Sequence, residues 1–108
     1  MNREEINRIV KEHVELVAPG FYSDLELLSK LSFNRRFTDL LVEEPGKLLE
    51  LLLRNNDPFT VFFVIKYLVL KPILSRIQRM DLLDYLSALF MEDTKEFRRS
   101  LIALIGNC

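Results

Sequence analysis

The side chains able to do acid–base or nucleophilic chemistry are few in this sequence. It contains one histidine, His13, and one cysteine, Cys108. His13 falls on the apolar stripe of the first expected helix, where we predict that it hydrogen-bonds a neighbouring carbonyl group. Cys108 is the last residue, and because chain ends fray, a Cys–His nucleophile pair is not expected. The sequence therefore predicts no catalytic residues and no enzyme activity.

Metal and cofactor sites are not predicted either. Structural zinc takes about four nitrogen or sulfur ligands, more than one histidine and one cysteine supply. The acidic pairs Glu43–Glu44 and Glu92–Asp93 stand at expected helix ends, where negative charge favours the N-terminal dipole of the next helix. The three glycines are scattered, so no glycine-rich phosphate loop exists. We expect no metal, no cofactor and no small-molecule substrate.

Basic residues gather where acidic ones are missing. The window from Lys66 to Arg79 has four positive charges and no negative one. If packing brings this window beside the basic residues of the last expected helix, the patch would hold several phosphates. The alternative is an ordinary solvated face that acidic neighbours balance. The candidate nucleic-acid contacts are Lys66, Lys71, Arg76, Arg79, Lys95, Arg98 and Arg99.

Large apolar residues are unusually frequent for a chain of this length. Twenty-one leucines and eight phenylalanines in 108 residues exceed what one small core clearly needs, and exposed apolar patches usually mark protein contacts. The alternative is that short helices around a buried one need wide apolar arcs. The candidate interface residues, at expected helix edges or turns, are Phe21, Tyr22, Leu53, Tyr85, Met91 and Ile102.

The elements that must position these side chains are helices. Asp57 is a good side-chain cap and Pro58 fits a first helical position. The segment from Pro58 to Leu70 then carries apolar residues on every side, with Lys66 its one charge. It is shorter than the roughly 18–20 residues of a membrane-spanning helix, so we expect neighbouring helices to bury it on all sides. Pro72 is expected to end or kink it.

Other helix starts are also legible. Asn2, Ser23 and Asp93 each precede a glutamate by three residues, as in a capping box. Ser32 and Asp81 are further expected caps. Phe59 to Ile65 also fits a strand, but no other segment offers it a partner. Leucine-rich helix pairs recur at 48–70 and 82–105, which leaves a solenoid-like repeat as an alternative to an irregular bundle.

Together these patterns predict an all-α fold, a single domain over residues 1–108. It is a compact bundle of about seven short helices around a buried central helix, Pro58 to Leu70. The net charge of −1 excludes bulk attraction to nucleic acid or an anionic membrane. The cysteine usage and the charged N-terminal segment favour the cytoplasm. The single glutamine, with arginine exceeding lysine, favours a thermophilic source.

The function that these observations favour is a non-enzymatic protein-interaction module or small accessory subunit. Its partner would be another protein or a second copy of itself in a homo-oligomer, and no membrane is involved. The alternative is a nucleic-acid-associated accessory protein that binds phosphates through its arginines.

Overall fold

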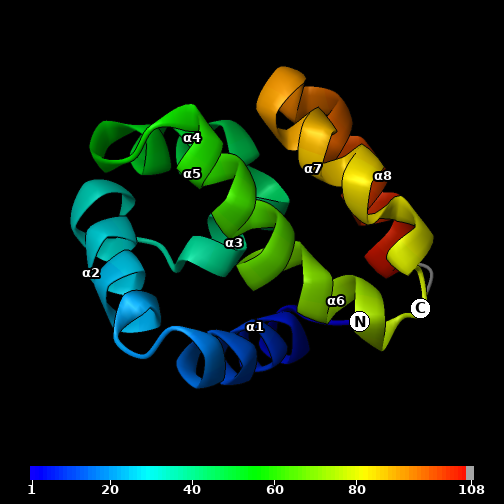
Figure 1. Ribbon diagram of the computed structural model, residues 1–108, viewed down its shortest axis with the longest axis horizontal. Helices are drawn as coiled ribbons and strands as arrows, with labels where there is room; N and C mark the ends of the chain where they lie inside the picture. Colours follow the sequence, from blue (N-terminus) through cyan, green and yellow to red (C-terminus); the bar gives the residue numbers. More distant parts are fainter. Residues whose placement is uncertain (107–108) are drawn as a thin grey trace.

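The computed structural model describes residues 1–106, and these residues form helices joined by tight turns (Figure 1). The all-α bundle predicted from the sequence is confirmed. In chain order the helices are α1 (Arg3–Val17), α2 (Phe21–Phe33), α3 (Phe37–Glu43), α4 (Pro45–Asn55), α5 (Pro58–Phe63), the π-helix η1 (Val64–Leu70), α6 (Lys71–Arg76), the 3₁₀-helix η2 (Met80–Leu82), α7 (Leu83–Glu92) and α8 (Thr94–Gly106).

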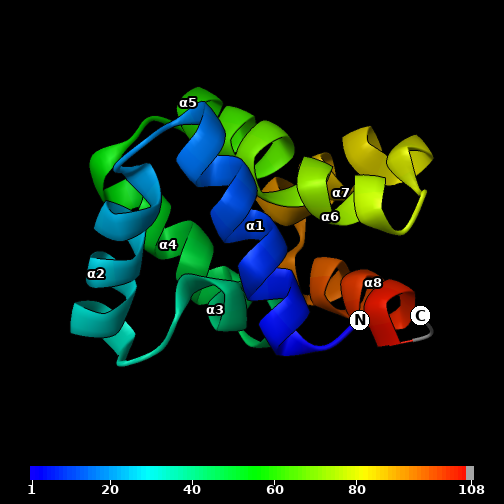
Figure 2. The same ribbon diagram turned by 90° about the horizontal axis from the view of Figure 1, so that it is seen from below.

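The central element is a continuous helical rod from Pro58 to Arg76, in which α5 leads into η1 and then α6 without a break. Helices α1, α4 and α7 pack against this rod, and Figure 2 shows α1 crossing it. Its central place agrees with the prediction, but the expected burial on all sides is wrong. Phe59 is 83% exposed and Phe63 is 52% exposed, because the neighbouring helices leave one face of the rod open to solvent.

The rod is, within residues 1–106, the one helix long and apolar enough to cross a membrane by length and composition alone. Its most apolar 18-residue window is 44% buried inside the bundle. A core helix of a globular protein passes the same test, and the contacts that this rod makes with α1, α4 and α7 are those of a core helix.

The expectation that Pro72 ends the central helix is wrong, because the helix continues through it to Arg76; a kink at Pro72 stays a prediction. In an α-helix a proline removes one hydrogen bond and its ring clashes with the carbonyl four residues earlier. The preceding segment η1 adopts the wider π geometry instead, with bonds spanning five residues, as the Lys71 N–H shows by bonding the Lys66 carbonyl. The next carbonyl along is that of Tyr67. In the same π register it would accept a hydrogen bond from the N–H of residue 72, but Pro72 has no N–H.

The Tyr67 carbonyl finds its partner outside the rod. His13 Nε2, on α1, donates to it across 3.1 Å. The predicted hydrogen bond between His13 and a neighbouring carbonyl is thereby confirmed. It satisfies a backbone group that the π-to-proline junction would otherwise leave unpaired.

The predicted helix starts are confirmed at three positions, where the capping side chain bonds an N–H three residues ahead. Asn2 accepts the Glu5 N–H (2.8 Å), Asp57 the Thr60 N–H (2.9 Å) and Asp93 the Glu96 N–H (3.1 Å). The starts expected at Ser23 and Ser32 are wrong, because α2 begins at Phe21 and runs to Phe33. The start expected at Asp81 is also wrong: Asp81 lies in η2 and binds Arg79.

One connected hydrophobic cluster draws on every α-helix of the bundle. Its largest fully buried side chains include Phe37 on α3, Phe90 on α7 and Phe97 on α8. The rings of Phe90 and Phe97 meet edge to face with centroids 5.1 Å apart, a favoured aromatic geometry. Helix α7 packs in turn against α5 and η1, so the rod and the C-terminal helices share one core.

Candidate functional site

The exposed face of the rod carries three aromatic residues at helical spacing. Phe59, Phe63 and Tyr67 lie four residues apart, and we call them the aromatic stripe. Their exposed fractions are 83%, 52% and 37%, and the rings of Phe63 and Tyr67 stand 4.9 Å apart. Aromatic side chains supply large contact area with little conformational freedom to lose, so they are frequent anchors of protein interfaces.

The aromatic stripe is rigid because the rod behind it is anchored. Val61 and Ile65, on its opposite face, are fully buried. At its N-terminal end Asp57 accepts hydrogen bonds from both the N–H and the hydroxyl of Thr60, each 2.9 Å long. These hydrogen bonds, the backbone one first, lower the pKa of Asp57, so its carboxylate is charged at neutral pH.

Cationic side chains border the C-terminal end of the aromatic stripe. The Nζ atoms of Lys66 and Lys71 lie 5.1 and 6.0 Å from the centre of the Tyr67 ring, within cation–π range. Lys66 also binds Asp84 of α7 at 2.7 Å, and this hydrogen bond raises the pKa of Lys66. Lys71 is exposed, with no ion-pair partner among residues 1–106.

Beside Lys71 an open cleft of about 450 Å³ runs between α1 and α6. We call it the basic cleft. Arg8, Lys71 and Arg76 contribute positive charge, whereas Glu12 contributes one negative charge and lies 3.9 Å from Arg8. The further lining residues are Ile9, His13, Leu16, Pro72 and Ser75. The cleft has the charge to hold an anion, with apolar walls beside it.

The structure brings together only part of the predicted basic patch. Lys71 and Arg76 meet in the basic cleft, joined by Arg8, which is not among the predicted contacts. Lys66 is bound to Asp84 and Arg79 to Asp81. On α8, Arg99 binds Glu96, Arg98 donates to the Glu43 carbonyl at 2.8 Å, and Lys95 is exposed.

The predicted interface residues are scattered over the bundle. Leu53 is 40% exposed and Tyr85 53% exposed. Phe21, Met91 and Ile102 are partly buried against the core. Tyr22 is only 7% exposed, and its single O–H lies within hydrogen-bond distance of two acceptors, Asn7 Oδ1 (2.8 Å) and Glu26 Oε2 (3.0 Å). Tyr22 is thus a core residue.

The aromatic stripe is not among the interface residues predicted from the sequence, although its signal is present there. Phe59, Phe63 and Tyr67 repeat at intervals of four, which is a single helical face. The surrounding apolar residues hid this pattern because they suggested burial all round.

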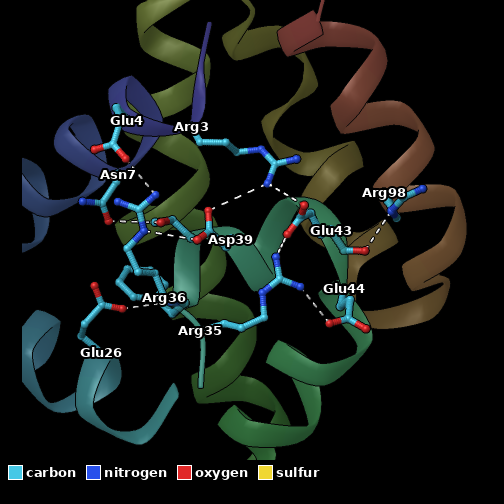
Figure 3. Close-up of polar contacts among 12 residues, drawn as sticks. Arg3, Glu4, Asn7, Glu26, Arg35, Arg36, Asp39, Glu43, Glu44 and Arg98 are labelled. Atoms are coloured by element: carbon cyan, nitrogen blue, oxygen red, sulfur yellow. Dashed lines mark hydrogen bonds and ion pairs between the residues drawn. The ribbon is translucent and has the colours of Figure 1, made fainter. Parts of the chain in front are cut away.

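Most remaining charged residues near α3 hold the bundle together (Figure 3). Arg35 binds Glu43 and Glu44, and Arg36 binds Glu4 and Asp39. Arg3 of α1 adds ion pairs to Asp39 (3.8 Å) and Glu43 (3.2 Å). The Arg35–Arg36 pair therefore links the short helix α3 to its neighbours.

The side chains that could do catalytic or metal chemistry lie as follows in the described part of the chain. His13 is engaged with the Tyr67 carbonyl, and Cys108 lies outside the described residues. Within residues 1–106 no three His, Cys, Asp or Glu side chains converge to hold a metal ion. Comparison with protein families, with curated proteins and with solved structures finds no match to this chain.

Proposed function

We propose that this protein is a non-enzymatic interaction module of the cytoplasm that binds another protein chain through the aromatic stripe. The observation that carries this proposal is the exposure of Phe59 and Phe63 on a helix whose other face is locked into the core. Burying a phenylalanine side chain contributes about 1.5–3 kcal/mol. A partner that covers the stripe would gain this energy without ordering the rod first.

The shape of the stripe favours a protein partner over a small molecule. Phe59 and Tyr67 are eight residues apart, which is about 12 Å along a helix. Phe59 and Phe63 are 83% and 52% exposed to solvent, whereas small ligands bind in concave pockets. A helix or groove of another chain matches a ridge of this length.

Photo-crosslinking tests this proposal. Phe59 is replaced by p-benzoylphenylalanine, and the purified protein is irradiated in an extract of its native cells. The matched control carries the same group at Leu31, which is 75% exposed on α2. We expect discrete crosslinked proteins from position 59 that position 31 does not give. Equal patterns from the two positions, or no crosslinks from position 59, would contradict the proposal.

A second candidate function rests on the basic cleft. Arg8, Lys71 and Arg76 bring three positive charges together, which supports a nucleic-acid-associated accessory role. If three phosphates are neutralised on duplex DNA, affinity should fall about 40-fold between about 50 and 200 mM salt. Fluorescence anisotropy measures this slope. We expect Lys71→Glu with Arg76→Glu to abolish binding and Lys95→Glu on α8 to leave it unchanged; no binding at the lower salt concentration rules this role out.

A further inference from the structure

We infer that the basic cleft binds a phosphate monoester, that is, a phosphate dianion joined to an apolar or aromatic group. The cleft is separate from the aromatic stripe, so this inference goes beyond the interaction module and does not depend on it. Three features of the cleft carry the inference: cations that converge from two helices, a positive balance of charge, and apolar walls.

Helix α1 and the rod run in opposite senses where they form the cleft. Towards the C-terminal end of α1, His13 bonds the carbonyl of Tyr67. Towards its N-terminal end, Glu5 shares a small depression with Arg76, which lies nine residues further along the rod. Figures 1 and 2 both show α1 beside α6. The residues of α1 between positions 5 and 13 therefore face the rod between positions 67 and 76.

This arrangement brings three cations to one cleft. Arg8 lines it from α1, and Lys71 and Arg76 line it from α6. Lys71 and Arg76 are five residues apart, which is about 7.5 Å along an α-helix, so both can reach one phosphate group placed between them. Among residues 1–106 neither of these two forms an ion pair. Their charges are therefore available to a ligand.

The acidic residues nearby leave the cleft with a positive balance. Of the described residues, Glu12 is the one acid that lines it, and its carboxylate lies 3.9 Å from Arg8. Glu5 lines the next depression, and Asp84 of α7 is paired with a lysine of the rod. Three positive charges and one negative charge leave a net charge of +2. A phosphate monoester carries about −1.5 to −2 at pH 7, whereas a backbone phosphodiester carries a single charge, so the balance favours the monoester.

The remaining walls suit the organic part of such a ligand. Ile9, Leu16 and Pro72 are apolar, and Leu16 is 82% exposed. The hydroxyl of Ser75, also in the lining, can donate to a phosphate oxygen. The volume of about 450 Å³ falls within the range of about 300–1,000 Å³ that small-ligand sites occupy. No such site is expected from the sequence, because Arg8 is remote from α6 along the chain.

The single histidine of the chain makes binding directly measurable. His13 lines the cleft, so the NMR signals of its ring report occupancy without overlap from another histidine. Phenyl phosphate is the probe, and we expect it to bind the full chain with a Kd below about 1 mM. Phenyl sulfate has a similar shape but one negative charge, and should bind about tenfold more weakly. Inorganic phosphate lacks the ring and should also bind about tenfold more weakly.

Substitutions separate the cleft from general surface charge. Arg8→Gln and Arg76→Gln remove one cation from each helix, and each should weaken binding of phenyl phosphate at least about tenfold. Glu12→Gln removes the acid and should tighten binding about threefold. Loss of folding would not produce such a gain. The matched control Arg99→Gln removes the same charge from α8, outside the cleft, and should leave the Kd unchanged.

Two sources supply this chemistry, and further probes distinguish them. Adenosine 5′-monophosphate represents a free organic phosphate. A thymidine tetranucleotide with a 5′-phosphate represents the end of a nucleic-acid strand, and the same tetranucleotide with a 5′-hydroxyl is its control. Tighter binding of the mononucleotide would support a small-molecule ligand. Tighter binding of the tetranucleotide, only when it carries the 5′-phosphate, would support a strand end.

The results that would overturn the inference are equally definite. The first is no change in the His13 signals at about 10 mM phenyl phosphate. The second is equal affinity for phenyl phosphate and phenyl sulfate, or an affinity that both arginine variants leave unchanged. The third is binding of the two tetranucleotides with equal affinity and more tightly than the mononucleotide, which would leave the nucleic-acid backbone as the ligand. None of these results bears on the aromatic stripe, which the crosslinks from position 59 test independently.

Discussion

The hydrogen bond from His13 to the Tyr67 carbonyl allows a sharp test of why the rod tolerates Pro72. The Tyr67 carbonyl has no intrahelical donor because the Lys71 N–H bonds Lys66 and residue 72 is a proline. His13→Ala removes the donor that replaces it across 3.1 Å. Pro72→Ala restores an N–H inside the rod. The two substitutions therefore act on one carbonyl and should not be additive.

The magnitude follows from the partial burial of this contact. A hydrogen bond contributes about 1 kcal/mol net, and a fully buried carbonyl left unpaired costs about 1–3 kcal/mol. His13 is half-buried, so water reaches part of the carbonyl in the variant. We expect His13→Ala to lower the free energy of unfolding by about 1 kcal/mol, or the Tm by about 4–6 °C. In the Pro72→Ala background the same change should cost less than about 0.5 kcal/mol.

Urea denaturation of the four proteins in this double-mutant cycle measures the coupling. The expected coupling energy is roughly 0.5–1 kcal/mol. His13→Gln, which keeps an N–H donor, should lose less stability than His13→Ala. If His13→Ala costs the same in both backgrounds, within about 0.3 kcal/mol, then His13 does not stand in for the missing proline N–H.

Three further predictions concern the core. Burial and the charge of Glu26 raise the pKa of Tyr22 to about 12. Because the unfolded chain loses this proton near pH 10, stability should fall as the pH rises from about 10 to 12, and Tyr22→Phe should abolish that part of the loss in pH-dependent urea melts. The Ser29 hydroxyl is fully buried with no hydrogen-bond partner among residues 1–106, so Ser29→Ala should stabilise the protein by about 0.5–1 kcal/mol. The matched Ser87→Ala removes a 2.7 Å bond to a carbonyl and should show no such gain in thermal melts. Phe97→Ala empties a fully buried site and should cost about 3–5 kcal/mol in urea denaturation; a loss under 1 kcal/mol would contradict the packing.

Helix starts were predictable where the information is local. At Asn2, Asp57 and Asp93 a single side chain bonds an N–H three residues ahead, and no distant contact intervenes. The helix start predicted at Ser23 is wrong because Gly20, with φ of +88°, turns the chain before Ser23 and lets α2 begin at Phe21. Glycine adopts this left-handed conformation at no steric cost. The spacing of Ser23 and Glu26 does not indicate this turn.

The candidate site was predictable only in composition. Surplus apolar surface is expected from the number of leucines and phenylalanines, but the composition does not indicate which face of the rod remains uncovered. In the π segment the consecutive residues Leu68, Val69 and Leu70 are all buried, a run that does not follow the α-helical period. If α5 and η1 are both placed on a regular α-helical wheel, their apolar residues together cover every side of it. The sequence pattern therefore suggests burial all round. The meeting of Arg8 with Lys71 and Arg76 depends on how α1 crosses α6, which is a tertiary contact.

The π-helix has a consequence for how this chain tolerates change in length. A turn that closes across five residues holds one residue more than an α-turn. Deleting a single residue between 64 and 70 would therefore let this segment adopt α geometry. The rod would keep nearly the same length, because the π-turn would lose only its extra residue. Residues after the deletion would keep their places in the core. If the deleted residue lies between 64 and 66, the Tyr67 carbonyl would also come into α register with the Lys71 N–H. An insertion into the α-helical parts of the rod could not be absorbed in this way. It would rotate the residues that follow it about the helix axis, and so move the basic cleft away from the aromatic stripe.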